Sequence, residues 1–480
     1  MTKLDFLSLL PHTVLLVWAA LLLLVDLAIP KHRKGITALL AAVGLAISLV
    51  LVVTQIGQHQ LAYNRMAVVD GFAVFLNILF LLAGIAAVAI APDYLRRLKL
   101  ERGEYYPLLL FSVAGMMLMA SAADLITVFL ALELLSIPLY ILSGLAVARE
   151  ESEEAALKYF LLGAFASGFV LYGTSLVYGA TGYTDISEIV AAIQAGTATP
   201  GLLLAGGGLL LVGFGFKIAV FPFQVWTPDV YQGAPSPVTA FMSVGAKAAG
   251  FAALVRVFSL VFPHMAASLA PVMAVLAALT MIFGNISAVT QGNIKRMLAY
   301  SSIAHAGYLL MAFVSYDQVV AGTNSIASIL FYLFSYAIAS LGAWAVVTAM
   351  EKAEGKGLEI IDYAGLAKKQ PALAAAMAVF MLSFTGIPPA LGFWGKLYLF
   401  QTAIQGGYLW LAIIGLLTSV ASAWYYLRVI VMMYMRDGEP EVTGDLWVKV
   451  VPYVAAVALL VIGFFPGKLL AWALAAILKI

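Results

Sequence analysis

The chain is a succession of long apolar runs separated by short polar segments. An apolar run of about 20 residues can cross a bilayer as a helix. The pattern predicts 14 spans, at residues 10–29, 35–54, 71–91, 106–122, 124–147, 155–178, 201–224, 237–262, 267–290, 295–314, 322–350, 371–401, 407–434 and 448–470. Pro466 interrupts the last run, so the tail is expected either to continue that helix or to lie at the membrane interface. We therefore expect an all-α polytopic membrane protein with about 14 transmembrane helices.

Composition supports this fold class and excludes several others. Hydrophobic residues make up 64% of the 480 residues and charged residues 10%, whereas a typical soluble domain is about 25% charged. A water-soluble globular enzyme is therefore excluded, and the net charge of +2 excludes a polybasic nucleic-acid binder. Because the chain has no cysteine, it cannot form disulfides or bind iron–sulfur clusters through thiolates. Its five histidines show no metal-ligand spacing, so we expect no metal and no cofactor in this chain.

The basic residues of the loops predict an orientation. Sixteen of them fall in the odd-numbered loops, and only Lys3, Arg65 and Lys479 fall on the opposite side. Basic residues are enriched in cytoplasmic loops. We therefore expect the odd-numbered loops to face the cytoplasm and both termini to face the outer side.

Several ionisable residues lie inside the predicted spans. Glu133 is in span 5, Lys217 and Lys247 are in spans 7 and 8, and Lys396 is in span 12. A charge at the centre of a span is unfavourable by about 2.5–3.5 kcal/mol, so such residues usually have a function. Lys158 is nearer the end of span 6, where a lysine can instead extend to the interface. A purely structural ion pair between Glu133 and a lysine is a further alternative.

These residue types suit proton transfer. Burial disfavours the charged form of a lysine, and a nearby carboxylate favours it, so a coupled Lys/Glu row can act as an electrostatically driven relay. His305 lies in the middle of span 10, where its two ring nitrogens could connect two lysines or simply satisfy hydrogen bonds in the core. Arg256 and Arg428 are interpreted as anchors near the cytoplasmic ends of spans 8 and 13.

Two spans carry helix-breaking residues beside a lysine. Pro222 follows Lys217 in span 7, and Pro388-Pro389 precedes Lys396 in span 12. Proline interrupts a helix, and irregular backbone at membrane depth occurs where it is buried or lines a wet cavity. Corresponding breaks in two halves indicate transporter-like repeats. We predict two inverted five-helix repeats, helices 4–8 and 9–13, with broken helices 7 and 12.

These repeats divide the chain into four predicted parts. A three-helix segment (1–105) precedes the first repeat (106–262) and the second repeat (263–436), and a C-terminal helix (437–480) follows them.

The motifs around the breaks resemble a known family. The stretch from Gly213 to Lys217, the following Trp226-Thr227-Pro228-Asp229-Val230-Tyr231 and the run from Gly292 to His305 are similar to the antiporter-like subunits of respiratory complex I. Gly386-Ile387-Pro388-Pro389 through Lys396 fits the same family. The motif at residues 226–231 favours the subunit N (subunit 2) branch of proton-translocating NADH:quinone oxidoreductase over the paralogous subunits L and M.

The resemblance implies proton-transfer roles for the residues that match the family's motifs, which are Glu133, Lys158, Lys217, Lys247, His305 and Lys396. Gln224 departs from the pattern, because many relatives carry a histidine there. Glutamine cannot take up and release a proton, so a titrating role is lost at this position.

The resemblance also implies partners and a location. NADH, flavin, iron–sulfur clusters and quinone are expected in partner subunits, with subunits K and M and the lateral helix of subunit L as neighbours in the bacterial inner membrane. The alternatives are a subunit of a multisubunit Na⁺/H⁺ antiporter or of a membrane-bound hydrogenase, and a structural membrane scaffold.

Overall fold

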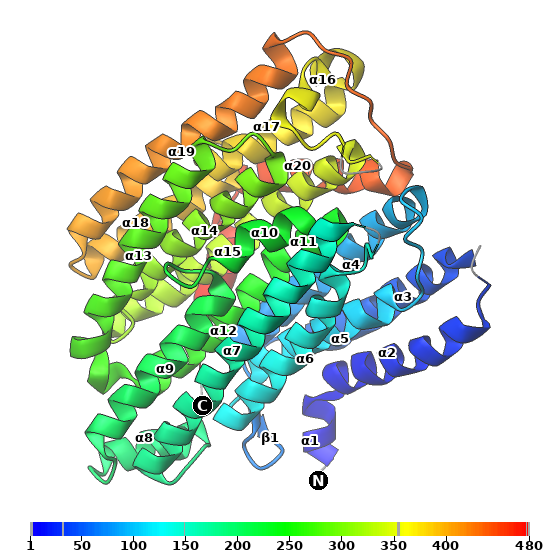
Figure 1. The fold of residues 1–480 in the computed structure, drawn as a ribbon. Coiled ribbons are helices and arrows are strands. Elements are labelled where there is room, and N and C mark those ends of the chain that lie inside the picture. The colour runs from blue at the N-terminus through cyan, green and yellow to red at the C-terminus, as the bar shows by residue number, and fades with distance from the viewer. Residues whose placement is uncertain (1–2, 31–32, 148, 353–355, 477, 479–480) are drawn as a thin grey trace.

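The computed structural model of the chain describes residues 3–30, 33–147, 149–352, 356–476 and 478; Lys479 of the predicted charge pattern lies outside them. The molecule is a bundle of long helices that run side by side, with the loops gathered at its two ends (Figure 1). In the described residues, eleven helical stretches are long and apolar enough to cross a membrane.

The elements follow the apolar runs of the sequence. Up to residue 97 they are α1 (Lys3–Ser8), α2 (Leu10–Ala28), α3 (Gly35–Val53), β1 (Gln60–Ala62), β2 (Ala67–Val69) and α4 (Gly71–Arg97). The next are α5 (Tyr105–Ser121), α6 (Leu125–Ser143), α7 (Glu150–Thr181), α8 (Ile186–Gln194), α9 (Pro200–Ile218), α10 (Trp226–Gly233), α11 (Ser236–Phe241), the π-helix η2 (Met242–Ala246) and α12 (Lys247–Val261). Then come η3 (Pro263–Met265), α13 (Ala266–Val289), α14 (Ile294–Phe313), α15 (Val319–Met350), η5 (Ile360–Tyr363) and α16 (Leu366–Lys369). The last are α17 (Pro371–Thr385), α18 (Leu391–Gln405), α19 (Leu409–Met435), α20 (Leu446–Phe464) and α21 (Gly467–Ala475).

Each of the 14 predicted spans lies on a helix or on a broken helix. The spans beyond the eleven are α5, which has only 17 residues, α14, which carries Lys295, Arg296 and His305, and the broken pair α17 and α18. The interruption at Pro466 separates α20 from α21, so the tail continues as a short helix.

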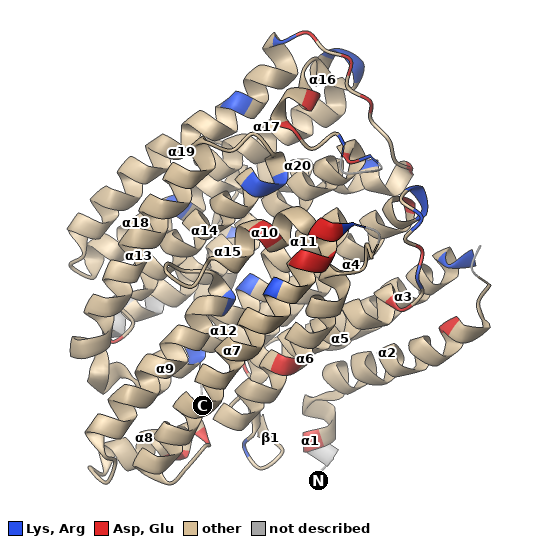
Figure 2. Cartoon of the chain, in the orientation of Figure 1, with Lys and Arg blue, Asp and Glu red and all other residues tan. Residues whose placement is uncertain are grey.

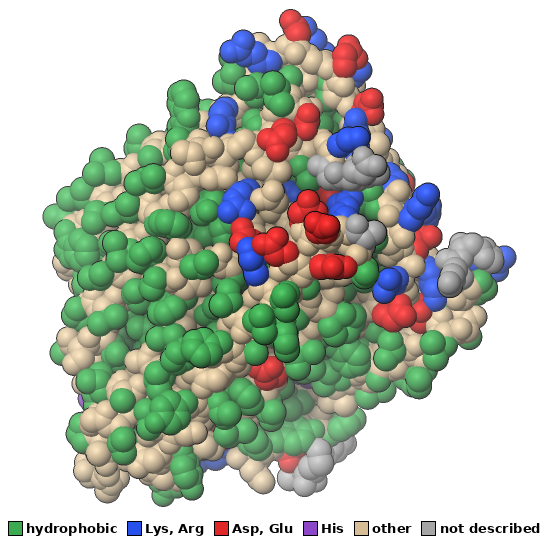
Figure 3. All heavy atoms as spheres, in the orientation of Figure 1, with side chains coloured by type: hydrophobic (Ala, Val, Ile, Leu, Met, Phe, Trp, Pro, Cys, Tyr) green, Lys and Arg blue, Asp and Glu red, His purple; other side chains and the backbone are tan. Residues whose placement is uncertain are grey.

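The two ends of the bundle differ in charge. The β1–β2 hairpin, α8 and both chain termini lie at one end, which we call the terminal end (Figure 1). The loops 98–104, 144–147, 356–370 and 436–445 lie at the other, which we call the basic end. Charged residues gather at the basic end, while hydrophobic side chains cover most of the visible face away from it (Figures 2 and 3). This pattern fits helices that cross a membrane with their basic loops on one side.

The two broken helices run in opposite directions. The first half of one, α9, follows α8 and starts at the terminal end, whereas α17 follows α16 and starts at the basic end (Figure 1). Each half-helix stops on a left-handed residue, Ala219 (φ 61°) or Gly386 (φ 87°). Opposed breaks are the arrangement expected of inverted repeats that contain an odd number of helices. The residue boundaries of the four predicted parts remain predictions.

The interpretation of Arg256 as an anchor near the basic end is wrong. Its side chain is only 1% exposed, and its guanidinium group donates to both carboxylate oxygens of Asp70, at 3.0 Å each, and to the carbonyl of Ala120. Asp70 caps the start of α4 beside the β1–β2 hairpin, so the pair lies toward the terminal end and joins α12 to the N-terminal helices. A buried bidentate pair is a structural contact, which hydropathy alone cannot distinguish from an anchor.

Candidate functional site

The first buried lysine lies between α6, α7 and the break after α9. Lys217 is 4% exposed, and its ammonium group donates to the hydroxyls of Ser136 at 2.7 Å and Tyr159 at 3.3 Å. Glu133 is half-buried one helical turn before Ser136 on α6, which places both on the same side of that helix. The charge of Glu133 acts on Lys217. One buried oxygen of Glu133 has no hydrogen-bond partner among the described residues.

The break itself helps to hold Lys217. Lys217 lies in the last turn of α9, where helix carbonyls lose their intrahelical partners and the helix dipole favours a positive charge. Gly250 of α12 packs directly against it: a Cβ atom at Gly250 would lie 3.3 Å from Lys217 Cγ and 2.7 Å from a methyl group of Ile218. The missing side chain therefore lets α12 approach the stem of Lys217.

The second lysine, Lys247, follows a π-helical turn. Residues Met242–Ala246 form that turn, and Lys247 begins α12 with 2% of its surface exposed. Its ammonium group donates to the carbonyl and to the hydroxyl of Ser302 on α14. Single π-turns within α-helices are frequent at functional sites, because they rotate the side chains that follow.

His305 is enclosed by aromatic side chains of α14, α15 and α17. It is 2% exposed on α14, three residues after Ser302, and its ring nitrogens face the hydroxyls of Tyr332 and of Tyr426, the latter at 3.0 Å. The charges of both Lys247 and Lys396 act on it. His305 is thus one helical turn from Ser302, the serine that binds Lys247.

The last lysine follows the second break. Lys396 is 4% exposed on α18 and donates to the hydroxyl of Ser419 at 2.7 Å and to the carbonyl of Thr385, the final residue of α17, at 3.0 Å. It also lies over the ring of Tyr308, 5.0 Å from its centre. A carbonyl at the end of a half-helix is a good acceptor for an ammonium group, because it has no partner within its own helix.

Lys158 has a different environment. Its side chain is 39% exposed, and its ammonium group forms ion pairs of 2.6 Å with Glu154 on α7 and with Asp229 on α10. Arg296 binds the other oxygen of Asp229 at 2.7 Å. Glu133 thus lies one helical turn from Ser136, which binds Lys217, and His305 lies one turn from Ser302, which binds Lys247. Lys158 instead belongs to a partly exposed ion-pair group.

Comparison with known proteins assigns the family. A family model described as "NADH:quinone oxidoreductase/Mrp antiporter, TM" matches residues 122–422. The chain belongs to this family. The NADH-quinone oxidoreductase subunit N of Trichlorobacter lovleyi is 48% identical over 469 residues, covering 96% of this chain and 95% of the relative.

Solved structures of antiporter-like subunits share the fold. A chain of respiratory complex I from Thermus thermophilus, solved with bound aureothin, is 37% identical, with a TM-score of 0.84 over 97% of this chain and all of that one. A chain of the Mrp complex from Dietzia sp. matches with a TM-score of 0.85 at 21% identity, over 99% of this chain and 97% of that one, and shows the fold alone.

Glu133, Lys217, Lys247, His305 and Lys396 are called the row from here on. Sequence reasoning missed the neutral partners of these residues. Ser136, Ser302 and Ser419 bind the three buried lysines, and Tyr332 and Tyr426 bind His305. Single serines and tyrosines are common in transmembrane helices, so their presence carried no signal. Two of these residues have a distinguishing neighbour in the sequence. Ser302 lies three residues before His305, and Tyr426 directly follows Tyr425.

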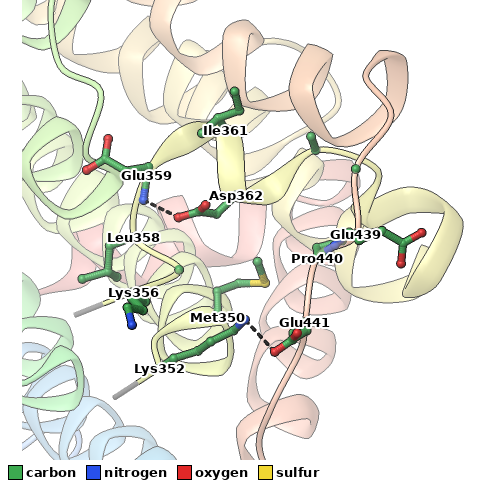
Figure 4. A pocket seen from close by; sticks show the side chains of 13 residues that line it. Met350, Lys352, Lys356, Leu358, Glu359, Ile361, Asp362, Glu439, Pro440 and Glu441 are labelled. Carbon is green, nitrogen blue, oxygen red and sulfur yellow. Dashed lines mark hydrogen bonds and ion pairs between the residues drawn. The ribbon is translucent and has the colours of Figure 1, made fainter. Parts of the chain in front are cut away.

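A pocket of about 580 Å³ lies at the basic end, away from the row. It opens between the segment 356–364 and the loop 438–441 (Figure 4). Its polar groups already have partners: Lys352 binds Glu441 at 2.6 Å, and Asp362 accepts from the backbone of Glu359 at 3.0 Å. None of the residues that line it belongs to the buried row.

Proposed function

We propose that this chain moves protons across the bacterial inner membrane as a membrane-arm subunit of NADH:quinone oxidoreductase. The full-length likeness to subunit N and to a chain of complex I supports the assembly. The observation that carries the proposal is the placement of Lys217: a buried lysine beside a helix break that binds Ser136, one helical turn from Glu133 on α6.

Glu133 and Lys217 form the responsive part of the row. Burial disfavours the ammonium form of Lys217, and the carboxylate of Glu133 favours it. Glu133 is half-buried and borders lipid-facing residues such as Ile137 on the outer side of α6, so a neighbouring subunit can change its charge state. Quinone reduction elsewhere in the complex drives that change, and neutralisation of Glu133 releases the proton of Lys217.

The proton then passes through Lys247 and His305 to Lys396. Lys247 and His305 are joined through α14, because Ser302 binds Lys247 one turn before His305. Water enters and leaves beside the two breaks. Gln224, which is 3% exposed in the first break and has an unpartnered buried oxygen, can bind such water but cannot itself carry a proton. Lys158, with its partly exposed ion pairs, would act at the edge of the row.

The rest of the assembly follows from the same assignment. The basic end faces the cytoplasm and both termini face the outer side, as the loop charges favour. NADH, flavin, iron–sulfur clusters and quinone belong to partner subunits, and this chain carries no redox centre. Subunits K and M and the lateral helix of subunit L are its neighbours.

Replacing Lys217 with alanine tests the proposal. We expect Lys217→Ala to reduce coupled NADH turnover and proton pumping while the complex still assembles, because Ser136 and Tyr159 are neutral and can be hydrated when the amine is gone. Full coupled turnover in a stably assembled Lys217→Ala complex would refute the role. Sodium-dependent transport without NADH oxidation would instead favour the antiporter alternative.

A further inference from the structure

A buried ionic cluster lies at the basic end, apart from the row described above. Its centre is Glu351, which caps the end of α15 and is fully buried. The carboxylate accepts hydrogen bonds from Tyr94 of α4 at 2.9 Å, from Arg149 at the start of α7 at 2.9 Å and from Ser236 of α11. Lys295 of α14 lies 3.9 Å away. Four helices thus direct polar groups at one buried carboxylate.

Arg149 is the boundary between this cluster and water. Its side chain is 23% exposed, whereas those of Lys295 and Glu351 are 2% and 0% exposed. Burial raises the pKa of Glu351, but Lys295, Ser236 and Arg149 together outweigh burial and hold that pKa below its usual range. The carboxylate is therefore charged at neutral pH, and of its partners Tyr94, Ser236, Lys295 and Arg149 only Arg149 is partly exposed.

A series of buried hydroxyl groups lies between this cluster and Lys247. Ser236, Thr239 and Ser243 recur at helical spacing ahead of Lys247, and the π-turn Met242–Ala246 contains Ser243 and ends directly before Lys247. Ser236 binds Glu351 at one end. All three side chains are fully buried, in a segment whose other side chains are apolar or small.

The neighbouring helices complete the connection. Ser243 shares a 2.9 Å hydrogen bond with Ser340 of α15, and Tyr336 on the same helix contacts both Ser340 and Ser302. Ser302 in turn binds Lys247. Hydroxyl groups can pass a proton along such a line, because each accepts one proton and donates its own.

We propose that Glu351 is the proton-uptake group at the basic end, and that it supplies Lys247 through Ser236, Ser243, Ser340, Tyr336 and Ser302. In this step Arg149 swings away, a proton from cytoplasmic water forms an O–H bond on Glu351, and that bond breaks as an N–H bond forms on neutral Lys247. The inference rests on the proposed function, because it presumes that Lys247 belongs to a proton path.

A structural staple is the competing explanation. A buried ion pair that only joins helices affects how much complex assembles, but not the rate of each assembled complex. It gives no role to the bond between Ser243 and Ser340, which involves no charged group. The two explanations therefore differ in turnover per complex and in the solvent deuterium isotope effect, which grows when proton uptake becomes limiting.

The test uses the complete complex, purified and reconstituted into vesicles. We expect Glu351→Gln to lower NADH-driven proton pumping per complex at least about tenfold, the size of effect typical of a lost proton-transfer group, and to raise the isotope effect. Ser243→Ala is expected to lower pumping about threefold without loss of complex. Matched controls are Glu441→Gln, an exposed carboxylate at the same end, and Ser112→Ala, a buried serine of α5 that binds the Leu135 carbonyl; both should pump normally.

The outcomes separate this inference from the proposed function. If Lys217→Ala lowers pumping while Glu351→Gln and Ser243→Ala pump at the parental rate per complex, the uptake path is overturned and the proposed function stands. If Lys217→Ala itself pumps normally, the proposed function fails. Should Glu351→Gln fail to assemble, Ser243→Ala decides alone: parental pumping and an unchanged isotope effect overturn the path.

Discussion

The surroundings of Lys217 and Lys396 are alike in most respects. Each lysine is 4% exposed, lies beside a helix break and donates to a serine hydroxyl at 2.7 Å. Each also lies over a tyrosine ring, at 5.4 Å from Tyr159 or 5.0 Å from Tyr308. At both sites the buried ammonium group therefore contacts a serine hydroxyl and a tyrosine ring. Neutral partners of this kind bind a protonated lysine without fixing the proton permanently.

The difference between them is a carboxylate. Glu133 acts on Lys217, whereas within the described part of the chain Lys396 has no carboxylate partner and binds only Ser419, the Thr385 carbonyl and the ring of Tyr308. Under the proposed function, the first site responds to a charge change in a neighbouring subunit, and the second responds to charge that arrives through His305 and Lys247. The proposal therefore puts the driving step in the first half and the release step in the second.

Removing Lys396 should have the largest effect. We expect Lys396→Met to lower NADH-driven proton pumping at least about tenfold, because Lys396 ends the proposed path and its neutral partners Ser419 and Tyr308 cannot hold the proton in its place. Dye-quenching in inverted vesicles measures the rate. Lys468→Met is the matched control, since Lys468 lies exposed on α21. Normal pumping by the Lys396 variant would show that the two sites are not equivalent parts of one path.

Removing the carboxylate should have a smaller effect that is confined to the first site. Glu133→Gln keeps the shape of the side chain but not its charge, so Lys217 loses its electrostatic support. We expect pumping to fall several-fold, less than in the lysine variants, because the neutral partners of Lys217 remain. Glu188→Gln, at an exposed position on α8, serves as the control. Equal pumping in parent and Glu133→Gln would remove the proposed driving step.

The two glycines that contact the lysines allow a further comparison. Gly386 has φ 87° and no room for a side chain, since a Cβ there would lie 2.9 Å from Lys396 Cδ. Gly386→Ala should therefore destabilise the break by about 1–2 kcal/mol and displace Lys396. Gly250→Ala keeps a helical backbone, although its Cβ would lie 2.7 Å from a methyl group of Ile218, which must then move. Gly386→Ala should therefore lower thermal stability and pumping more than Gly250→Ala does. A larger loss in Gly250→Ala would contradict the role of the second break.

The tyrosine hydroxyls should matter least. Tyr159→Phe and Tyr308→Phe keep the ring beside each lysine and remove only a hydroxyl group, which in Tyr159 forms a long 3.3 Å bond. We expect each variant to change the pumping rate less than about twofold. Leucine at the same positions also removes the ring and should lower the rate further. A severe defect in either phenylalanine variant would mean that these hydroxyls carry protons.

Much of the architecture could be predicted from the sequence. The positions of the helices follow from apolar runs that are long enough to span a bilayer, and the two breaks follow from Pro222 and Pro388-Pro389. These features are local, so they can be recognised without knowing what packs against them. The charged members of the row were found because a charge within an apolar run is rare.

The contacts of the row could not be predicted in the same way. Arg256 was misinterpreted because its partner Asp70 is 186 residues away in sequence and precedes a different helix. Glu351 and Lys295 were not singled out, since each lies at the end of a span where charges are common. Long-range packing decides whether such residues face water or one another, and no pattern within a single helix contains that information.

The most direct test counts the protons pumped per NADH oxidised by the purified complex in sealed vesicles. Parent and Lys217→Met complexes are compared at equal amounts of assembled complex. The account predicts that the variant transfers fewer protons per NADH, because the first site can no longer bind the proton that Glu133 controls. An unchanged ratio in the fully assembled variant would contradict the claim that this chain carries protons through its buried lysines.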